Sequence, residues 1–146
     1  MKISNSKTLF IFLFLLSIQF TFAQKDGRIS TVDFVQIVDG NRAETMYYYE
    51  HNWKVLRVMA LEKNYIASFE IMETPYSEEA PFHLMLITTY KNAAQYEQRE
   101  KRFQELIKQK GKLELLNDKK PPAFRKNLFH KEEVMYYSKE ISVKKG

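Results

Sequence analysis

The sequence contains no cysteine and has only 4 glycines and 4 prolines among its 146 residues. The absence of cysteine excludes disulfide bonds, thiolate chemistry and a lipid anchor attached to a cysteine. The small share of glycine and proline, together with 14% aromatic residues, excludes collagen-like and intrinsically disordered chains. The composition is that of one globular domain.

The first 23 residues have the features of a secretory signal peptide. Lys2 and Lys7 form a short positive region, residues 8–22 are mostly apolar, and Ala23 is a small residue at the expected cleavage site. A helix needs about 20 apolar residues to cross a bilayer, whereas this run is shorter and is interrupted by polar side chains. We therefore expect cleavage before Gln24 and an exported protein, periplasmic or extracellular, without a membrane anchor.

The mature chain, residues 24–146, has little excess charge of either sign. Removal of two lysines leaves 21 basic and 18 acidic residues, and acids and bases are interspersed over 97–108. A nucleic-acid-binding domain usually carries a concentrated basic stripe, so we expect no nucleic-acid partner. A small exported domain without disulfides must gain its stability from its core or from a subunit interface, which favours a homodimer.

Hydrophobic periodicity and turn residues predict six elements in the mature chain. The closing strand lies at 124–130, at 134–141 or at both, and we prefer 134–141 for its Val, Met and Tyr content. The other expected elements are strands at 31–38, 65–74 and 82–90 and helices at 42–63 and 93–110, with a long hairpin loop at 75–81.

Both helices have recognisable ends and one apolar face. Asn41 and Glu44 match a capping box at the start of the first helix, and Asn64 and Gly111 suit left-handed positions at the two helix ends. Residues at spacings of three and four predict the buried faces. These are Met46, Tyr49, Trp53, Leu56 and Ala60 in the first helix and Ala93, Tyr96, Phe103, Leu106 and Ile107 in the second.

The element order predicts an α+β, ferredoxin-like βαββαβ fold with an antiparallel sheet. The strands at 31–38 and 82–90 are apolar on both faces. A sheet with two apolar faces needs cover on both sides. We therefore expect helices on one face and a second subunit on the other.

With this element order the chain resembles the dimeric α/β barrel superfamily. The superfamily includes antibiotic-biosynthesis-type monooxygenases, haem-degrading monooxygenases and NIPSNAP-like proteins. The resemblance covers residues 32–141 and rests on the element order, on the Tyr47–Trp53 stretch of the first helix and on the apolar strand at 82–87. It implies a homodimer with a ligand pocket in each subunit between the sheet and the long helix. No catalytic or haem-binding residue of the superfamily can be matched here, so no cofactor is expected.

His83, which interrupts the apolar strand at 82–90, is the candidate catalytic residue. If Glu73 lies opposite His83 across the hairpin, a carboxylate stands beside an imidazole, which suits a general base. A register shifted by one residue instead places His83 on the face of Glu70 and Met72. The three histidines lack the close spacing of metal ligands, so no metal site is expected.

An aromatic cluster on the first helix supplies the other candidate ligand-binding residues. Tyr49 and Trp53 should face the sheet, Tyr48 and His51 flank them, and Arg57 lies one turn further on. Such rings can stack on a flat ligand.

Three hypotheses follow for the function. The first is an exported homodimer that binds a small apolar or aromatic ligand through the residues Tyr48, Tyr49, His51, Trp53, Arg57 and Glu70. The second is a cofactor-independent monooxygenase or related oxidoreductase with His83 as base. The third is a structural dimerisation module of the cell envelope.

Overall fold

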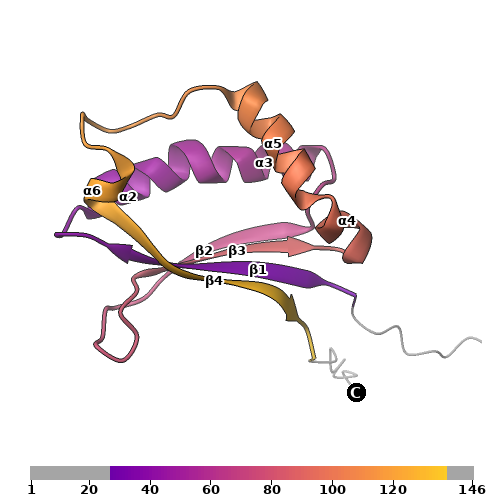
Figure 1. Ribbon diagram of the computed structural model, residues 1–146, viewed down its shortest axis with the longest axis horizontal. Helices are drawn as coiled ribbons and strands as arrows, with labels where there is room; N and C mark the ends of the chain where they lie inside the picture. The colour runs from indigo at the N-terminus through magenta and orange to yellow at the C-terminus, as the bar shows by residue number, and fades with distance from the viewer. Residues whose placement is uncertain (1–26, 138–146) are drawn as a thin grey trace, which may run out of the picture.

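The computed structural model describes residues 27–137 as a four-stranded antiparallel sheet with its helices on one face (Figure 1). The strand order is β2-β3-β1-β4, which is the order of the ferredoxin-like fold and confirms the predicted fold class. The elements are β1 (Ile29–Ile37), α2 (Arg42–Tyr48), η1 (Tyr49–Trp53), α3 (Lys54–Glu62), β2 (Ser68–Glu73), β3 (Leu84–Tyr90), α4 (Ala93–Glu97), α5 (Arg99–Lys110), α6 (Pro121–Phe124) and β4 (Arg125–Met135).

The side of the sheet that faces the helices holds the core. Val35, Leu84 and Leu86 pack against Tyr49 and Trp53 of the first helical segment. A second cluster at the other end joins the sheet to both long helices through Ile29, Ala60, Ile66, Tyr90, Tyr96 and Leu106. The predicted burial of Tyr49, Trp53, Ala60, Tyr96 and Leu106 is confirmed.

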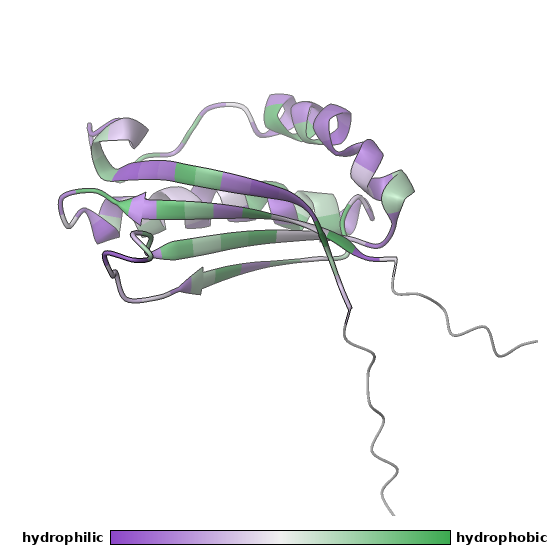
Figure 2. Ribbon diagram, turned by 60° about the horizontal axis from the view of Figure 1, so that its bottom comes forward, coloured by the Kyte–Doolittle hydropathy of each residue, from purple (hydrophilic) through white to green (hydrophobic). Residues whose placement is uncertain are grey.

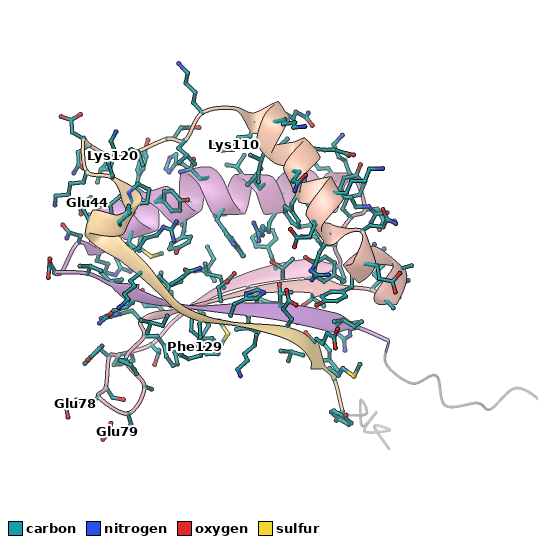
Figure 3. All side chains as sticks on the ribbon, viewed as in Figure 1. Glu44, Glu78, Glu79, Lys110, Lys120 and Phe129 are labelled. Atoms are coloured by element: carbon teal, nitrogen blue, oxygen red, sulfur yellow. The ribbon has the colours of Figure 1, made fainter. Side chains whose placement is uncertain are left out.

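The first helix is continuous from 42 to 62 but contains a π turn, η1, at Tyr49–Trp53. The turn brings the buried side chain of Asn52 towards the link that follows α5. Asn52 Nδ2 donates to the Tyr48 and Glu114 carbonyls at 3.0 and 2.8 Å, and Oδ1 accepts from the Glu114 amide and from Lys110 Nζ at 2.9 and 3.0 Å. Figure 3 labels Lys110, at the end of α5. A satisfied buried amide of this kind fixes the loop to the helix.

The preference for a closing strand at 134–141 is wrong. The closing strand β4 spans Arg125–Met135, so it contains the alternative segment 124–130 almost entirely, and 138–141 lies outside the described residues. The reason is the short helix α6, which starts on Pro121 and Pro122 and delivers the chain to β1 directly at Arg125. Two register irregularities then allow β4 to follow β1 over its whole length.

Three local expectations also need correction. The predicted capping box does not form, because Asn41 Nδ2 donates to the Val38 and Ala123 carbonyls while the Glu44 carboxylate accepts from Lys119 and Asn117. Strand β2 starts at Ser68 rather than at 65, because the Tyr65 amide still donates to the Ala60 carbonyl of the preceding helix. In the second helical region, Ala93 and Ile107 are exposed rather than buried.

No helix formed by residues 27–137 covers the opposite side of the sheet (Figure 1). Met72, Met85, Phe34 and Phe129 are register partners across all four strands and form one continuous apolar row on this side. Figure 2 brings this side forward and shows hydrophobic stretches along the strands, and Figure 3 shows Phe129 below the sheet, away from the helices. We call this side the open face. None of the described helices is long and apolar enough to span a membrane.

Candidate functional site

A partly enclosed cavity of about 230 Å³ lies between the helix layer and the part of the sheet formed by β1 and β4. One register row explains why the cavity is polar at its base. Across the sheet, Ile71 pairs with Leu86, Leu86 with Asp33, and Asp33 with His130, so the helix-facing side changes from apolar to ionisable at β1. Leu56, Phe103 and Ile107 from α3 and α5 form the apolar walls.

Asp33 and His130 form a carboxylate–imidazole pair at the cavity. The distance from His130 Nδ1 to Asp33 Oδ1 is 2.7 Å, and both residues line the cavity. An ionised carboxylate only accepts hydrogen bonds, so Nδ1 carries the proton in the neutral imidazole. His130 Nε2 is then the basic nitrogen, and it lies 3.5 Å from Glu132 Oε1. This is the arrangement in which an acid orients a histidine for proton transfer.

Arg57 reaches the cavity from α3 between two aromatic rings. Its guanidinium carbon lies 4.1 Å from the centre of the Trp53 ring and 4.5 Å from that of Phe103, and Nε donates to Thr88 Oγ1 at 3.3 Å. Burial disfavours the charged form and lowers the pKa of Arg57 to about 10. The guanidinium is therefore charged at neutral pH. Within residues 27–137, no carboxylate forms an ion pair with it.

The second arginine of the cavity is neutralised by its neighbours. Arg99 stacks on the Tyr96 ring at 4.0 Å and pairs with Glu132 at 3.1 Å and with Glu100 at 3.6 Å. The hydrogen bond from Arg99 lowers the pKa of the Glu132 carboxyl. Burial raises the pKa of Tyr90, whose ring is almost fully buried at the end of β3, so its hydroxyl stays protonated.

The structure brings only two of the sequence-predicted site residues together at the cavity. Arg57 lines it, and Trp53 adjoins it through the stack on Arg57. Tyr48 and Tyr49 lie with Arg125, whose guanidinium contacts both hydroxyls at 3.3 and 3.4 Å. His51 Nδ1 donates to the Tyr47 carbonyl at 2.9 Å, and its ring stacks on the Tyr47 ring, apart from the cavity.

His83 belongs to the open face of the sheet. The register with Glu73 opposite His83 is wrong, because Glu73 pairs with Leu84 and the Thr74 amide donates to the His83 carbonyl. The alternative register holds, and places His83 on the face of Glu70 and Met72. Nδ1 of His83 accepts the Ile37 amide at 3.0 Å, so that nitrogen is not free to accept another proton.

The two predicted carboxylates are likewise separate from the cavity. Glu70 is exposed on the open face, opposite Ile87. Glu73 forms a two-pronged pair with Arg42, with both N–O distances at 2.7 Å, and this hydrogen bonding lowers the pKa of Glu73.

The sequence reasoning missed Asp33 and His130. Asp33 is a lone acid within an apolar strand, at the same parity as the buried Thr31 and Val35. This signal places it on the helix-facing side. His130 could not be assigned, because the preferred closing strand began after it. Within 27–137 no three acidic or histidine side chains are arranged to hold a metal ion.

No protein-family model matches the chain, and no curated protein matches its sequence. One solved structure that is similar is described as a "Putative antibiotic biosynthesis monooxygenase" from Bordetella bronchiseptica. The match covers 75% of this chain and 99% of that chain, at 16% sequence identity and a TM-score of 0.38. The fold assignment rests on the strand order, and this similarity carries no argument about activity.

We expect His83 and His130 to be opposite tautomers when both are neutral. His130 should carry its proton on Nδ1, since that nitrogen faces the Asp33 carboxylate, and His83 on Nε2, since its Nδ1 accepts an amide proton. Long-range proton–nitrogen correlation spectra in mildly alkaline buffer distinguish the two forms, and Asp33→Asn serves as the control. An Nε2 proton on His130 contradicts the assignment.

Proposed function

We propose that this chain is an exported homodimer that binds a small aromatic molecule in the cavity between the sheet, α3 and α5. The observation that carries the proposal is the convergence of Arg57, Tyr90 and His130 on one cavity with apolar walls. Ligand sites in proteins are typically clefts lined by apolar side chains with a few polar groups that fix the orientation of the ligand.

The size of the cavity limits the ligand. A cavity of about 150 Å³ holds one benzene molecule, so about 230 Å³ suits a single ring with one or two small substituents. Phe103, Leu56 and Ile107 offer apolar surface to such a ring. A purely structural dimerisation module does not require such a cavity, so the ligand-binding hypothesis is preferred.

The proposed dimer forms through the open face. Phe34 stacks on Phe129 with ring centres 4.4 Å apart, and Phe82 meets Phe34 edge-on at 4.9 Å. These rings lie in or beside the apolar row of Met72, Met85, Phe34 and Phe129. A large exposed apolar patch is characteristic of an interaction surface. A second open face offers the same chemistry, so a second copy is the partner that fits.

Export is supported by the sequence of the first 23 residues, with their two lysines, apolar run and Ala23. The absence of cysteine fits the same proposal together with the dimer, because an exported domain that cannot use disulfides gains stability by burying its open face.

A second candidate function is proton-transfer catalysis, as in a cofactor-independent oxygenase. The Asp33–His130 pair favours it, because His130 Nε2 can accept a proton from a bound phenol or enol. The resulting anion is electron-rich and therefore more readily oxidised by dioxygen. His130 takes the role of base in this proposal, in place of His83.

The dimer predicts a specific effect of charge on the open face. We expect the mass of the exported chain to match residues 24–146. The exported protein should scatter light as a dimer at micromolar concentration. Phe129→Glu should weaken association at least about a hundredfold by burying an unpaired charge. Val58→Glu is the matched control, since Val58 is 41% exposed and Phe129 44%, but Val58 lies in the helix layer. A monomeric wild type, or a dimer that survives Phe129→Glu, contradicts the proposed interface.

Ligand binding should be localised to the cavity. Substituted single-ring compounds such as phenol, catechol and benzoate should bind with millimolar or tighter affinity and shift the amide signals of Thr31, Arg57 and Tyr90. Ile107→Trp should weaken binding by filling the cavity, whereas Val58→Trp, on the outer side of α3, should not. Shifts confined to the open face or to the Tyr48–Arg125 cluster refute the site.

The catalytic candidate predicts a difference between two histidines. If hydroquinones are oxidised with dioxygen uptake, His130→Gln should reduce the turnover number about a hundredfold or more. His83→Gln should leave it within about twofold, because His83 lies on the other side of the sheet. Equal losses in both variants, or no loss in His130→Gln, exclude His130 as the base.

A further inference from the structure

Resting on the proposed ligand site, we infer that its ligand is an anion: a single-ring aromatic carboxylate whose carboxylate group pairs with Arg57. This assignment follows from the way Arg57 is held and from the state of every other charged group that lines the cavity.

Arg57 is held in one orientation before any ligand arrives. The Trp53 and Phe103 rings lie at 4.1 and 4.5 Å from its guanidinium carbon, and Thr88 Oγ1 accepts from Nε. A guanidinium has five N–H donors, and among residues 27–137 only the Nε donor of Arg57 has a hydrogen-bond partner. The two terminal nitrogens therefore retain donors on a side chain that lines the cavity, in the planar fork that matches a carboxylate.

The other charged groups of the cavity already have partners. Asp33 is paired with His130 at 2.7 Å, and Glu132 and Glu100 are paired with Arg99 at 3.1 and 3.6 Å. Arg57 is thus the charge without a counter-ion among the described residues that line the cavity. A half-buried charge without a partner is costly, and a bound anion would supply the missing interaction.

The same surroundings select the kind of anion. Three carboxylates line the cavity, so a doubly charged group such as a phosphate monoester would be repelled more strongly than a carboxylate. The apolar walls of Leu56, Phe103 and Ile107 accommodate the ring. The ligand that fits the cavity therefore has two parts, a flat apolar ring and one planar, singly charged group.

The chain offers a matched control for Arg57. Arg102 also stacks on an aromatic ring, with its guanidinium carbon 4.6 Å from the centre of the Tyr65 ring, and forms no ion pair among the described residues. It comes from α5 but does not line the cavity. Arg57→Met and Arg102→Met therefore remove the same kind of stacked cation inside and outside the proposed site.

The test compares benzoate with benzamide, which have the same ring but differ in charge. Binding is followed by calorimetry and by the emission of Trp53, the one tryptophan of the sequence, which adjoins Arg57. The wild type should bind benzoate about ten- to a hundredfold more tightly than benzamide, as expected for a charge-assisted hydrogen-bond pair. Arg57→Met should bind both compounds alike, and Arg102→Met should keep the wild-type ratio.

The outcomes separate this inference from the proposed function. Equal binding of both compounds by the wild type overturns the anion assignment and leaves the ligand site standing. Binding of neither compound overturns both. A benzoate preference that persists in Arg57→Met, or is lost in Arg102→Met, overturns the assignment to Arg57. If Arg57→Met does not fold, Arg57→Lys replaces it: a several-fold smaller preference supports the inference, and an unchanged preference refutes the role of the guanidinium fork.

Discussion

The antiparallel pairing of β4 with β1 determines the chemistry of both faces of this sheet. It places His130 opposite Asp33 on the helix-facing side and Phe129 opposite Phe34 on the open face. Side chains alternate along a strand, so a slip of one residue would exchange the two faces of β4 and bring His130 among the phenylalanines. The cavity and the proposed dimer interface thus depend on one register.

Among the described residues, the partly buried arginines lie over aromatic rings more often than against carboxylates. Arg57, Arg99, Arg102 and Arg125 all lie over aromatic rings, and only Arg99 also has acidic partners among the described residues. Ring faces attract a cation without neutralising it. The interior therefore keeps positive charge that a carboxylate partner would have cancelled, and at Arg57 this charge faces a cavity.

Much of the fold could be predicted from the sequence, because local patterns decided it. The element order, the helix-facing residues Tyr49, Trp53 and Ala60, and the left-handed residues Asn64 and Gly111 follow from periodicity and from turn chemistry. The position of the closing strand could not be predicted in this way. The segments 124–130 and 134–141 have similar strand character, and only pairing with β1 selects between them.

The candidate site was harder to predict for the same reason. The capping pair at Asn41 and Glu44 was disrupted by Lys119, which is distant in sequence and binds both side chains. His83 interrupts an apolar strand, yet in the structure its Nδ1 accepts a hydrogen bond from a backbone amide. Asp33 and His130 form a candidate site only as a pair, and they lie 97 positions apart in the chain. No short sequence motif can reveal a pair at that separation.

The π turn at Tyr49–Trp53 affects how this chain should be compared with others. A π turn accommodates one more residue than an α-helical turn. The residues of α3 that face the sheet therefore carry numbers one higher than they would have after a regular α-helical turn. In a protein with a regular helix here, the position equivalent to Arg57 stands one residue earlier. A gapless alignment through this segment would pair Arg57 with a residue that points about 100° away around the helix axis, and an arginine at the equivalent position would be missed.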